Sequence, residues 1–420
     1  MNTNFVGRFA VMAAAFFLTG TLGAQDLVVT NGRILDGAGG VIENGTVVVQ
    51  DGRIVRVGSG AAVGTQAEII DARGLTVMPG FIEAHRHIVA GDASDWLENR
   101  AEAEMSAFLA AGFTTVLSAG DAPQLLGVRD RIRSGDLAGP RIFAAAFVPL
   151  AGPAGPPMPA GDPARFDTSR SGRPTSAAPA IPREQTVAAV EQIAEAGYDY
   201  LKNVIVVTPD GPEVETLQLV IQEGRRLGLP TITHAVSVVD TLAAVEAGPA
   251  VLVHTPHIGH LSDFPGAIET IVGAGIPMTS TLSVFSPHFG DNNEPLFRDG
   301  EPFPWNTLTS AGDGPTNARL LWEAGLSYGY GTDTQWPPKE SLLDELRALR
   351  GVFSPADVVT ILTRNAARSV LRGDDLGTLE PGKLADIVII DGDPLETSEA
   401  LLNVVTTIKG GEVVFDANGR

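Results

Sequence analysis

The 420-residue sequence contains no cysteine, so it can form neither a disulfide nor a lipid-modified N-terminal cysteine. Basic residues are also scarce, because 29 Lys and Arg face 50 Asp and Glu and give a formal net charge of −21. A surface this acidic repels phosphate backbones, and we therefore expect no nucleic-acid partner. The chain is long and 44% hydrophobic, which is sufficient for a large core without disulfides.

The apolar run nearest the N-terminus, residues 9–23, is shorter than the roughly 20 residues that a membrane-spanning helix needs. Arg8 precedes this run, and Leu22-Gly23-Ala24 resembles a cleavage site with small residues. The pattern predicts a secretory signal peptide over residues 1–24, with a retained anchor as the alternative. We therefore expect an exported protein, periplasmic or secreted, that has no membrane association after the signal is removed.

Strand-like segments occur at both ends of the remaining chain. Residues 25–79 alternate apolar with polar residues and contain the turn signals Asn31-Gly32 and Asp51-Gly52. The same alternation returns over residues 377–420. Because isolated hairpins are only marginally stable, we expect the two ends to pair into one small β-sandwich domain.

Strand-like and helix-like segments alternate over residues 80–376, which predicts a parallel α/β domain. Polar residues follow the apolar strands at their C-terminal ends, and this favours a (β/α)8 TIM-like barrel, whose catalytic groups lie there. A doubly wound open sheet is the alternative, but no G-x-G-x-x-G motif follows a first strand. Helical patterns cover residues 96–112, 184–197, 213–227 and 354–372.

Two segments are too irregular to be ordinary connections. Residues 149–183 are rich in Pro, Gly, Ala and Ser, and residues 284–305 gather aromatic side chains. Both follow expected barrel strands, so we expect them to overhang the active-site face, with surface decoration as the alternative.

Histidine is also rare, with seven in the whole chain, yet several stand at the ends of apolar strands. His85 and His87 form an H-x-H pair whose side chains point to one face of a strand. Alone, such a pair is more often structural or at the surface than metal-binding. His234 and His254 each end another strand, and Asp333 ends the last one. Four imidazoles and one carboxylate at successive strand ends suit Zn²⁺ or a similar metal.

Lys202 lies inside the hydrophobic segment "YDYLKNVIV", where a bare ammonium group is costly to bury. One interpretation is a lysine whose head reaches the rim of the barrel. The other is a lysine carboxylated by CO₂, because burial lowers the pKa and exposes the neutral amine that CO₂ needs.

This ordered set resembles the amidohydrolase superfamily of metal-dependent hydrolases. "VMPGFIEAHRH" near the start and "RNAARSVLRGDDLGTLEPGKLADIVIIDGDP" near the end resemble its members as well. Within the superfamily, "YLK", "THA", "LVHT" and "GTD" are similar to the branch of imidazolonepropionase-like enzymes, Xaa-Pro dipeptidases and ochratoxinase-like carboxypeptidases. The resemblance covers residues 26–420.

The resemblance implies two divalent metal ions, with Zn²⁺ the expected species. A hydroxide that bridges them would attack a polarised carbonyl, and Asp333 would carry its proton to the leaving amine. The implied ligands are His85, His87 and Asp333 on the more buried ion, His234 and His254 on the more exposed ion, and a carboxylated Lys202 between them.

Two departures from the family pattern bear on the substrate more than on the metal ions. Glu83 stands where the family often has Asp, in a position expected to support the ligands. The segment after "GPRIFAAAF" lacks the Gly-Gly-His stretch common in this branch.

His257 is the only competitor for the role of His254, and we prefer His254 because it ends a strand whereas His257 follows Pro256.

The expected activity is hydrolysis of an amide bond in a small peptide or N-acyl amino acid with an apolar part. Alternatives are a cyclic amide, lactone or phosphotriester as substrate, a catalytically silent binding protein on the same scaffold, and a metal-storage role. A homo-oligomer stays an open alternative to a monomer. Candidate substrate contacts are His257, His288, Phe289 and Trp336, and arginines for a substrate carboxylate are Arg165, Arg170, Arg173 and Arg298.

Overall fold

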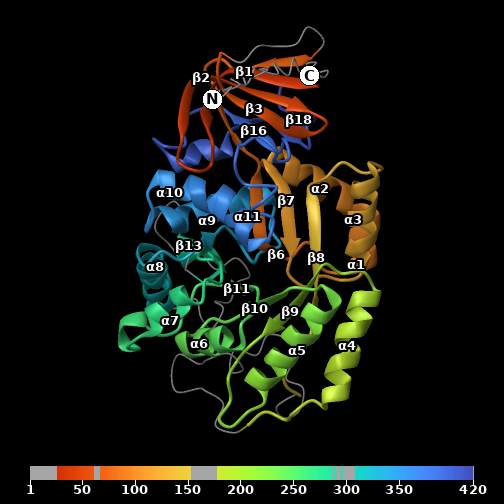
Figure 1. The fold of residues 1–420 in the computed structure, drawn as a ribbon, viewed down its shortest axis with the longest axis vertical. Coiled ribbons are helices and arrows are strands. Elements are labelled where there is room, and N and C mark those ends of the chain that lie inside the picture. The colour runs from red at the N-terminus through yellow and green to blue at the C-terminus, as the bar shows by residue number, and fades with distance from the viewer. Residues whose placement is uncertain are drawn as a thin grey trace, which may run out of the picture.

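The computed structural model describes residues 26–60, 67–152, 177–285 and 308–419, together with two short strands at 288–289 and 295–296 (Figure 1). The predicted signal peptide and most of the Pro-rich segment 149–183 lie outside these residues. None of the helices within the described ranges combines the length and the apolar character needed to span a bilayer.

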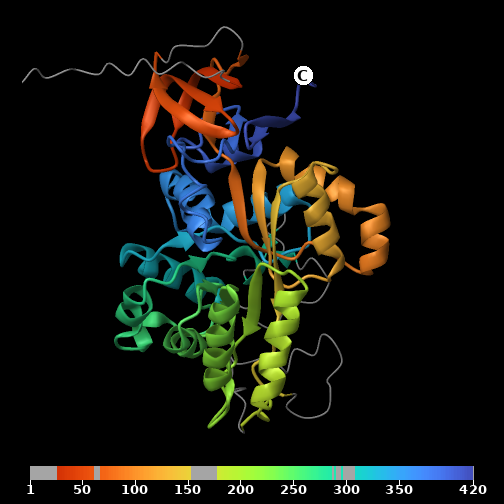
Figure 2. The ribbon, with the colours of Figure 1, turned by 45° about the vertical axis from the view of Figure 1, so that its right-hand side comes forward.

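One eight-stranded sheet joins the two ends of the chain, in the order β18-β17-β16-β5-β1-β2-β3 with β4 also paired to β1. β5 is its central link, because Thr76 pairs in parallel with Arg33 of β1 and Val77 pairs antiparallel with Ile389 of β16. Both views place the N-terminal and C-terminal strands together (Figures 1 and 2). The strands are β1 (Leu27–Leu35), β2 (Val41–Gln50), β3 (Arg53–Ser59), β4 (Glu68–Asp71), β5 (Thr76–Pro79), β16 (Ile387–Ile390), β17 (Val404–Lys409) and β18 (Glu412–Asp416).

The second sheet has eight parallel strands in the order β15-β12-β11-β10-β9-β8-β7-β6. The ring is completed by the backbone N–H of Ala84, which donates to the carbonyl of Tyr330 at 3.1 Å. The predicted (β/α)8 barrel with a β domain built from both chain ends is therefore confirmed. The strands are β6 (Phe81–Arg86), β7 (Phe113–Ser118), β8 (Arg141–Phe147), β9 (Tyr200–Val204), β10 (Thr231–His234), β11 (Val251–Val253), β12 (Met278–Thr279) and β15 (Tyr328–Gly329).

Helices alternate with these strands and cover the outside of the barrel (Figure 1). They are α1 (Ala93–Asn99), α2 (Ala101–Ala110), α3 (Gln124–Ser134), α4 (Arg183–Glu195), α5 (Glu213–Leu227), α6 (Val238–Ala247), α7 (Ala267–Gly273), α8 (Leu308–Glu323), α9 (Pro338–Arg350), α10 (Pro355–Thr360) and α11 (Ala366–Ser369). Short 3-10 helices lie at Leu261–Asp263, Ser283–Phe285 and Ser398–Leu402, and a π-helical turn, Ile361–Asn365, joins α10 to α11. The hairpin β13 (His288–Phe289) and β14 (Pro295–Leu296) forms a separate two-stranded sheet.

The helical patterns expected from the sequence correspond closely to these helices, with two differences. The pattern at 96–112 is divided into α1 and α2 at Arg100, whose backbone leaves the helical region. The pattern at 354–372 begins at the predicted Ser354 cap, where Asp357 completes a capping box, and is then widened by the π turn.

Candidate metal centre

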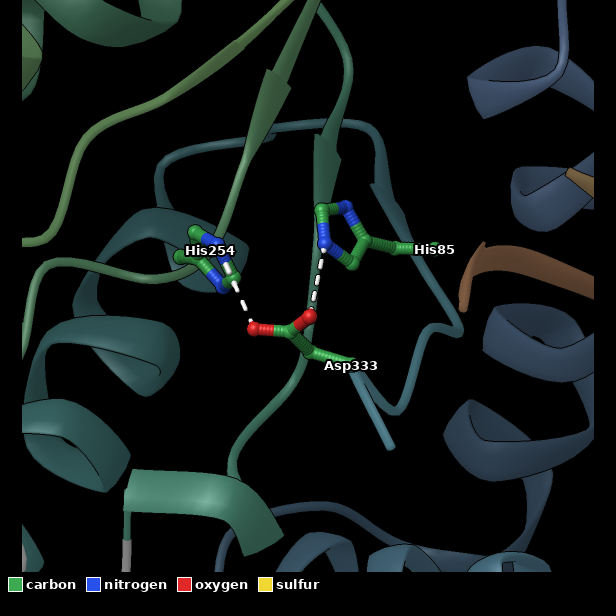
Figure 3. Close-up of side chains that lie close together, drawn as sticks. All are labelled: His85, His254 and Asp333. Carbon is green, nitrogen blue, oxygen red and sulfur yellow. Dashed lines mark hydrogen bonds and ion pairs between the residues drawn. The ribbon is translucent and has the colours of Figure 1, made fainter. Parts of the chain in front are cut away.

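Three histidines at the C-terminal mouth of the barrel aim their Nε2 atoms at one carboxylate, that of Asp333. The Nε2 atoms of His85 and His87 each lie 3.1 Å from Oδ1 of Asp333. From the other side, Nε2 of His254 lies 3.7 Å from Oδ2. Figure 3 shows the rings of His85 and His254 on either side of the carboxylate. One ligand atom each from His85, His254 and Asp333 lies within 4.8 Å of the others, a grouping that could hold a metal ion.

The backbone brings His85 and Asp333 together at the seam that closes the barrel. The N–H groups of Thr332 and Asp333 both donate to the carbonyl of His85, at 3.1 and 2.7 Å. Asp333 has φ +54°, which its short polar side chain tolerates better than most residues do. At Gly331 an added Cβ would lie 2.9 Å from Cβ of His85 and 3.2 Å from Cβ of Thr279. Only glycine therefore allows the last strand to approach this closely.

His234 and His254 form the second part of the centre. Their rings, from the ends of β10 and β11, have centroids 4.2 Å apart, and the ring of His254 is 4.7 Å from that of His85. His254 is 1% exposed, and its Nε2 has no hydrogen-bond partner among the described residues. A buried nitrogen with a free lone pair is costly unless a ligand occupies it, which fits a metal ion.

Lys202 enters the barrel from β9 and is 4% exposed. Its Nζ atom has no hydrogen-bond partner in the described part of the chain. Burial lowers the pKa of this amine to about 7, although the charge of Asp333 acts in the opposite direction. Lys202 therefore has an accessible neutral form near neutral pH, as carboxylation requires.

The charge states suit metal binding. Burial, assisted by the charge of Lys202, lowers the pKa of His85 to about 4 and that of His234 to about 3. Burial alone would raise the pKa of Asp333, but the neighbouring His85 and the hydrogen bonds from His85 and His87 bring it well below its usual value. Near neutral pH the imidazoles of His85 and His234 are therefore neutral and the carboxylate of Asp333 is ionised, the forms that bind metal ions. His87 differs, because burial alone would lower its pKa but its hydrogen bond to Asp333 raises it.

Two further carboxylates hold the backbone that carries the ligands. Glu83 is 1% exposed and accepts hydrogen bonds from the N–H of His85 at 3.0 Å and of Thr332 at 3.1 Å. Asp121 accepts from the N–H groups of Ile88 and Val89 at 2.7 and 3.2 Å, just after His87. The supporting position of Glu83 was predicted from the sequence, whereas that of Asp121 was not.

Arg86, between the two histidines of the H-x-H pair, is 3% exposed and points away from the ligands. Its guanidinium donates to Thr334 Oγ1 at 3.3 Å, to Ser341 Oγ at 3.1 Å and to the carbonyl of Trp336. It also lies 4.8 Å from the centroid of the Phe108 ring. Arg86 therefore joins the end of β6 to the loop that carries Asp333, a role that the sequence did not reveal.

The expected substrate contacts are placed unevenly. His257 is buried and its ring lies 4.4 Å from that of Phe285, which in turn is 5.1 Å from His254. Trp336 lines a cavity of about 380 Å³ with Arg86 and Phe108, whose described lining includes none of the predicted ligands. His288 and Phe289 form β13, but their side chains and all four candidate arginines lie outside the described residues.

Side-chain exposure shows from which direction the centre is open. The side chain of His87 is 33% exposed and that of Asp333 18%, whereas those of His85 and His254 are 1% and 0% exposed. Solvent therefore reaches the centre beside His87 and Asp333. His234, expected on the more exposed ion, is also partly exposed, so these exposures do not distinguish the two ions that the family resemblance implies.

Comparison with known proteins agrees with this geometry. Residues 76–414 match the amidohydrolase family. Imidazolonepropionase from Shouchella clausii is 30% identical over 206 residues, which cover 47% of this chain and 40% of that protein. Imidazolonepropionase from Caldanaerobacter subterraneus subsp. tengcongensis is 24% identical over 430 residues, covering 89% of this chain and 91% of the relative. A solved Xaa-Pro dipeptidase with bound methionine has a TM-score of 0.74 at 22% identity and covers 93% and 100% of the two chains.

The chain belongs to the amidohydrolase family, because the family match spans most of its length. It is accordingly a hydrolase that acts on carbon–nitrogen bonds, as the resemblance predicted. The family typically binds metal ions, and the cluster of His85, His254 and Asp333 could hold one.

Proposed function

We propose that the protein is a dinuclear metal hydrolase that cleaves an amide bond in a small peptide-like substrate, a dipeptide or N-acyl amino acid with an apolar part. The observation that carries the proposal is the convergence of three imidazole Nε2 atoms on the Asp333 carboxylate, beside a Lys202 amine that has no hydrogen-bond partner among the described residues. The proposed ligands are His85, His87, Lys202, His234, His254 and Asp333, and the proposed ions are two Zn²⁺.

Bound divalent ions would lower the pKa of a water molecule and polarise the substrate carbonyl. Asp333 then moves the proton: it is ionised at rest, is 18% exposed at the open side, and can accept a proton from the attacking water. As the new carbon–oxygen bond forms and the carbon–nitrogen bond breaks, Asp333 returns this proton to the leaving amine. His87 lies beside Asp333 on the same open side and would hold a metal ion next to this carboxylate.

Lys202 is proposed to be carboxylated, so that it supplies an anionic oxygen ligand. The lone pair of its neutral amine would form a bond to the carbon of CO₂, and the nitrogen would release one proton. Support comes from the burial of Nζ, which has no hydrogen-bond partner within the described ranges, and from the lowered pKa of this amine. The test is ¹³C NMR of metal-loaded protein in ¹³C-bicarbonate: a carbamate signal that is absent in Lys202→Met supports the modification, and its absence in the wild type contradicts it.

The apolar part of the substrate is inferred from the aromatic wall beside the ligands. Phe285 packs against both His254 and His257. It belongs to the aromatic segment at residues 284–305, which follows β12. The Xaa-Pro dipeptidase with the same fold makes proline-containing dipeptides reasonable members of a substrate panel. A cyclic amide, lactone or phosphotriester substrate is the alternative, because the same chemistry applies to each of these bonds.

The deciding experiment is hydrolysis by Zn²⁺-loaded protein of aromatic and proline-containing dipeptides, N-acyl amino acids, cyclic amides, lactones and phosphotriesters. Amine release reports cleavage of the amides, and acid release in a weakly buffered solution reports cleavage of the lactones and phosphotriesters. The same protein treated with a chelator and then reloaded with metal serves as the control. Release from the linear amides that is lost on chelation and restored by metal supports the proposal. Turnover of only the cyclic or ester compounds would favour the alternative, and no turnover of any compound would contradict both.

We also infer that the protein is exported, because residues 1–24 carry the charged and apolar regions of a secretory signal. Expression of the full chain in a Gram-negative host tests this inference. A mature protein in the periplasm or medium that begins close to residue 25 is expected. An intact N-terminus in the membrane fraction would instead indicate a retained anchor.

A further inference from the structure

His254 has a partner on the side of its ring that faces away from Asp333. Its Nδ1 atom lies 2.8 Å from Oγ1 of Thr281, and both residues are buried, at 1% and 0% exposed. Its Nε2 atom, on the opposite edge of the ring, faces Asp333. The imidazole is therefore held between a hydroxyl group and the proposed metal-binding side.

The backbone at Thr281 is in a conformation that threonine seldom adopts. Its φ is +46°, and a β-branched residue in this left-handed region is strained. Strain of this kind costs roughly 1–3 kcal/mol and persists only where the surroundings enforce it. The strain therefore needs a structural cause at this position, next to His254.

The surroundings do enforce this conformation. The N–H of Thr281 donates to the carbonyl of Gly331 at 2.9 Å, which ties the residue to the last barrel strand. The next two N–H groups, of Leu282 and Ser283, donate to the carboxylate of Glu345 at 2.9 and 2.8 Å. Glu345 is 0% exposed, so Thr281 is fixed between α9 and the strand that leads to Asp333.

We infer that Thr281 is a positioning residue that sets the tautomer and the ring orientation of His254. A neutral imidazole carries one N–H, and a metal ion can bind only at the nitrogen that lacks it. When Nδ1 donates its proton to Thr281 Oγ1, Nε2 keeps a free lone pair directed towards Asp333. The opposite arrangement, in which the hydroxyl donates to Nδ1, would place a proton on Nε2 and block the metal ion.

The backbone of His254 is restrained as well, so the ring has little freedom to adopt another orientation. Its φ is +80°, and its N–H is 3.2 Å from Oγ1 of Thr279. Two threonines two residues apart, Thr279 and Thr281, therefore fix the backbone and the ring of the same histidine. This inference rests on the proposed metal centre and adds a residue that no ligand motif includes.

The test compares Thr281→Val, which keeps shape and branching but removes the hydroxyl, with Thr281→Ser, which keeps the hydroxyl. Thr407→Val is the matched control, because Thr407, in β17 of the sheet domain, is also 0% exposed and donates its hydroxyl to the carbonyl of Leu109 in α2. The affinity for Zn²⁺ alone is measured by competition with a chromophoric chelator. In Thr281→Val we expect the Zn²⁺ ion at His254 to bind roughly 10–100-fold less tightly than in the wild type. The Zn²⁺ affinities of Thr281→Ser and Thr407→Val should remain close to the wild-type value.

A second measurement does not require the variants at Thr281. Long-range ¹H–¹⁵N NMR of histidine-labelled, Zn²⁺-loaded protein reports which nitrogen of His254 carries the proton, with His254→Asn for assignment. A proton on Nδ1 supports the inference, and one on Nε2 overturns it even if Thr281→Val does not fold. Wild-type affinity in a folded Thr281→Val protein also overturns it but leaves the metal centre intact. A wild-type protein that binds no Zn²⁺ would overturn the proposed function and this inference together.

Discussion

His85 and Asp333 are joined twice, once through their side chains and once through their backbones. Nε2 of His85 lies 3.1 Å from Oδ1 of Asp333, and the N–H of Asp333 donates to the carbonyl of His85 at 2.7 Å. The backbone bond does not depend on the chemistry of either side chain. The position of residue 333 can therefore be kept while its ability to accept a proton is removed.

Asp333→Asn should abolish turnover with little change in fold. The amide keeps the size of the side chain but cannot take a proton from the attacking water, and general acid–base catalysis contributes about 10²–10⁴-fold. We expect a loss of at least about 100-fold in the rate of amine release, with an unchanged far-ultraviolet circular dichroism spectrum. A folded variant with near wild-type turnover would exclude Asp333 as the proton carrier.

Gly331→Ala should disturb the centre although it replaces none of the proposed ligands. Its new methyl group would lie 2.9 Å from Cβ of His85, so the histidine or the last strand must move. Gly351→Ala is the matched control, because the nearest atom to its Cβ is 3.5 Å away. We expect weaker Zn²⁺ binding only in Gly331→Ala, measured by chelator competition. Equal affinity of the two variants would show that the close approach at Gly331 is unimportant.

Arg86→Met should destabilise the barrel even though Arg86 binds no metal ion. The change removes hydrogen bonds to Thr334 and Ser341 that each involve a charged group, and such bonds contribute roughly 1.5–3 kcal/mol. We expect the free energy of unfolding in urea to fall by roughly 3 kcal/mol or more.

The control for this prediction is Arg73→Met, because the Arg73 side chain is 77% exposed and its ion pair with Asp71 is solvated. Exposed pairs of this kind contribute about 0–1 kcal/mol. Similar losses of stability in the two variants would mean that the buried contacts of Arg86 add little.

Metal-free protein should lose stability in acid partly through His85. Burial lowers its pKa from 6.5 to about 4, so between these values the unfolded chain binds more protons than the folded one. The contribution of a neutral His85 is complete above pH 6.5 and is lost as the pH falls through about 4. Urea unfolding in the presence of a chelator should therefore depend less on pH in His85→Asn than in the wild type. An unchanged pH dependence would indicate that His85 is not buried in its neutral form.

Much of the fold could be predicted because it rests on local patterns. The alternation of residues 25–79 and 377–420 and the amphipathic helix at 213–227 are short-range signals, and α5 has the predicted bounds. β8 gave no such signal, because "RIFAAAF" is rich in alanine, which favours helix and shows no alternation. β12 and β15, each two residues long, are too short to show any period.

The residues of the candidate metal centre were likewise predictable only in part. The H-x-H pair and the histidines that follow β10 and β11 are visible because a rare residue type stands at the ends of strands. No sequence pattern distinguishes Asp121 or Thr281, because a single Asp or Thr near a turn can have several structural roles. Their roles depend on hydrogen bonds to residues 33 and 27 positions away, to Ile88 and His254 respectively, and only the folded chain shows these.

The pairing of β5 with both ends of the chain also constrains the order of folding. β5 reaches its neighbour β16 only after more than 300 residues have followed it, and the bond between His85 and Asp333 joins positions 248 residues apart. Contacts of such long range require closure of a large loop before they return any stabilisation. The pairing of β5 with β16 therefore waits for the C-terminal strands, and the proposed ligand set becomes complete only after Asp333 is available. Partial chains should for this reason bind metal ions poorly, whichever end they lack.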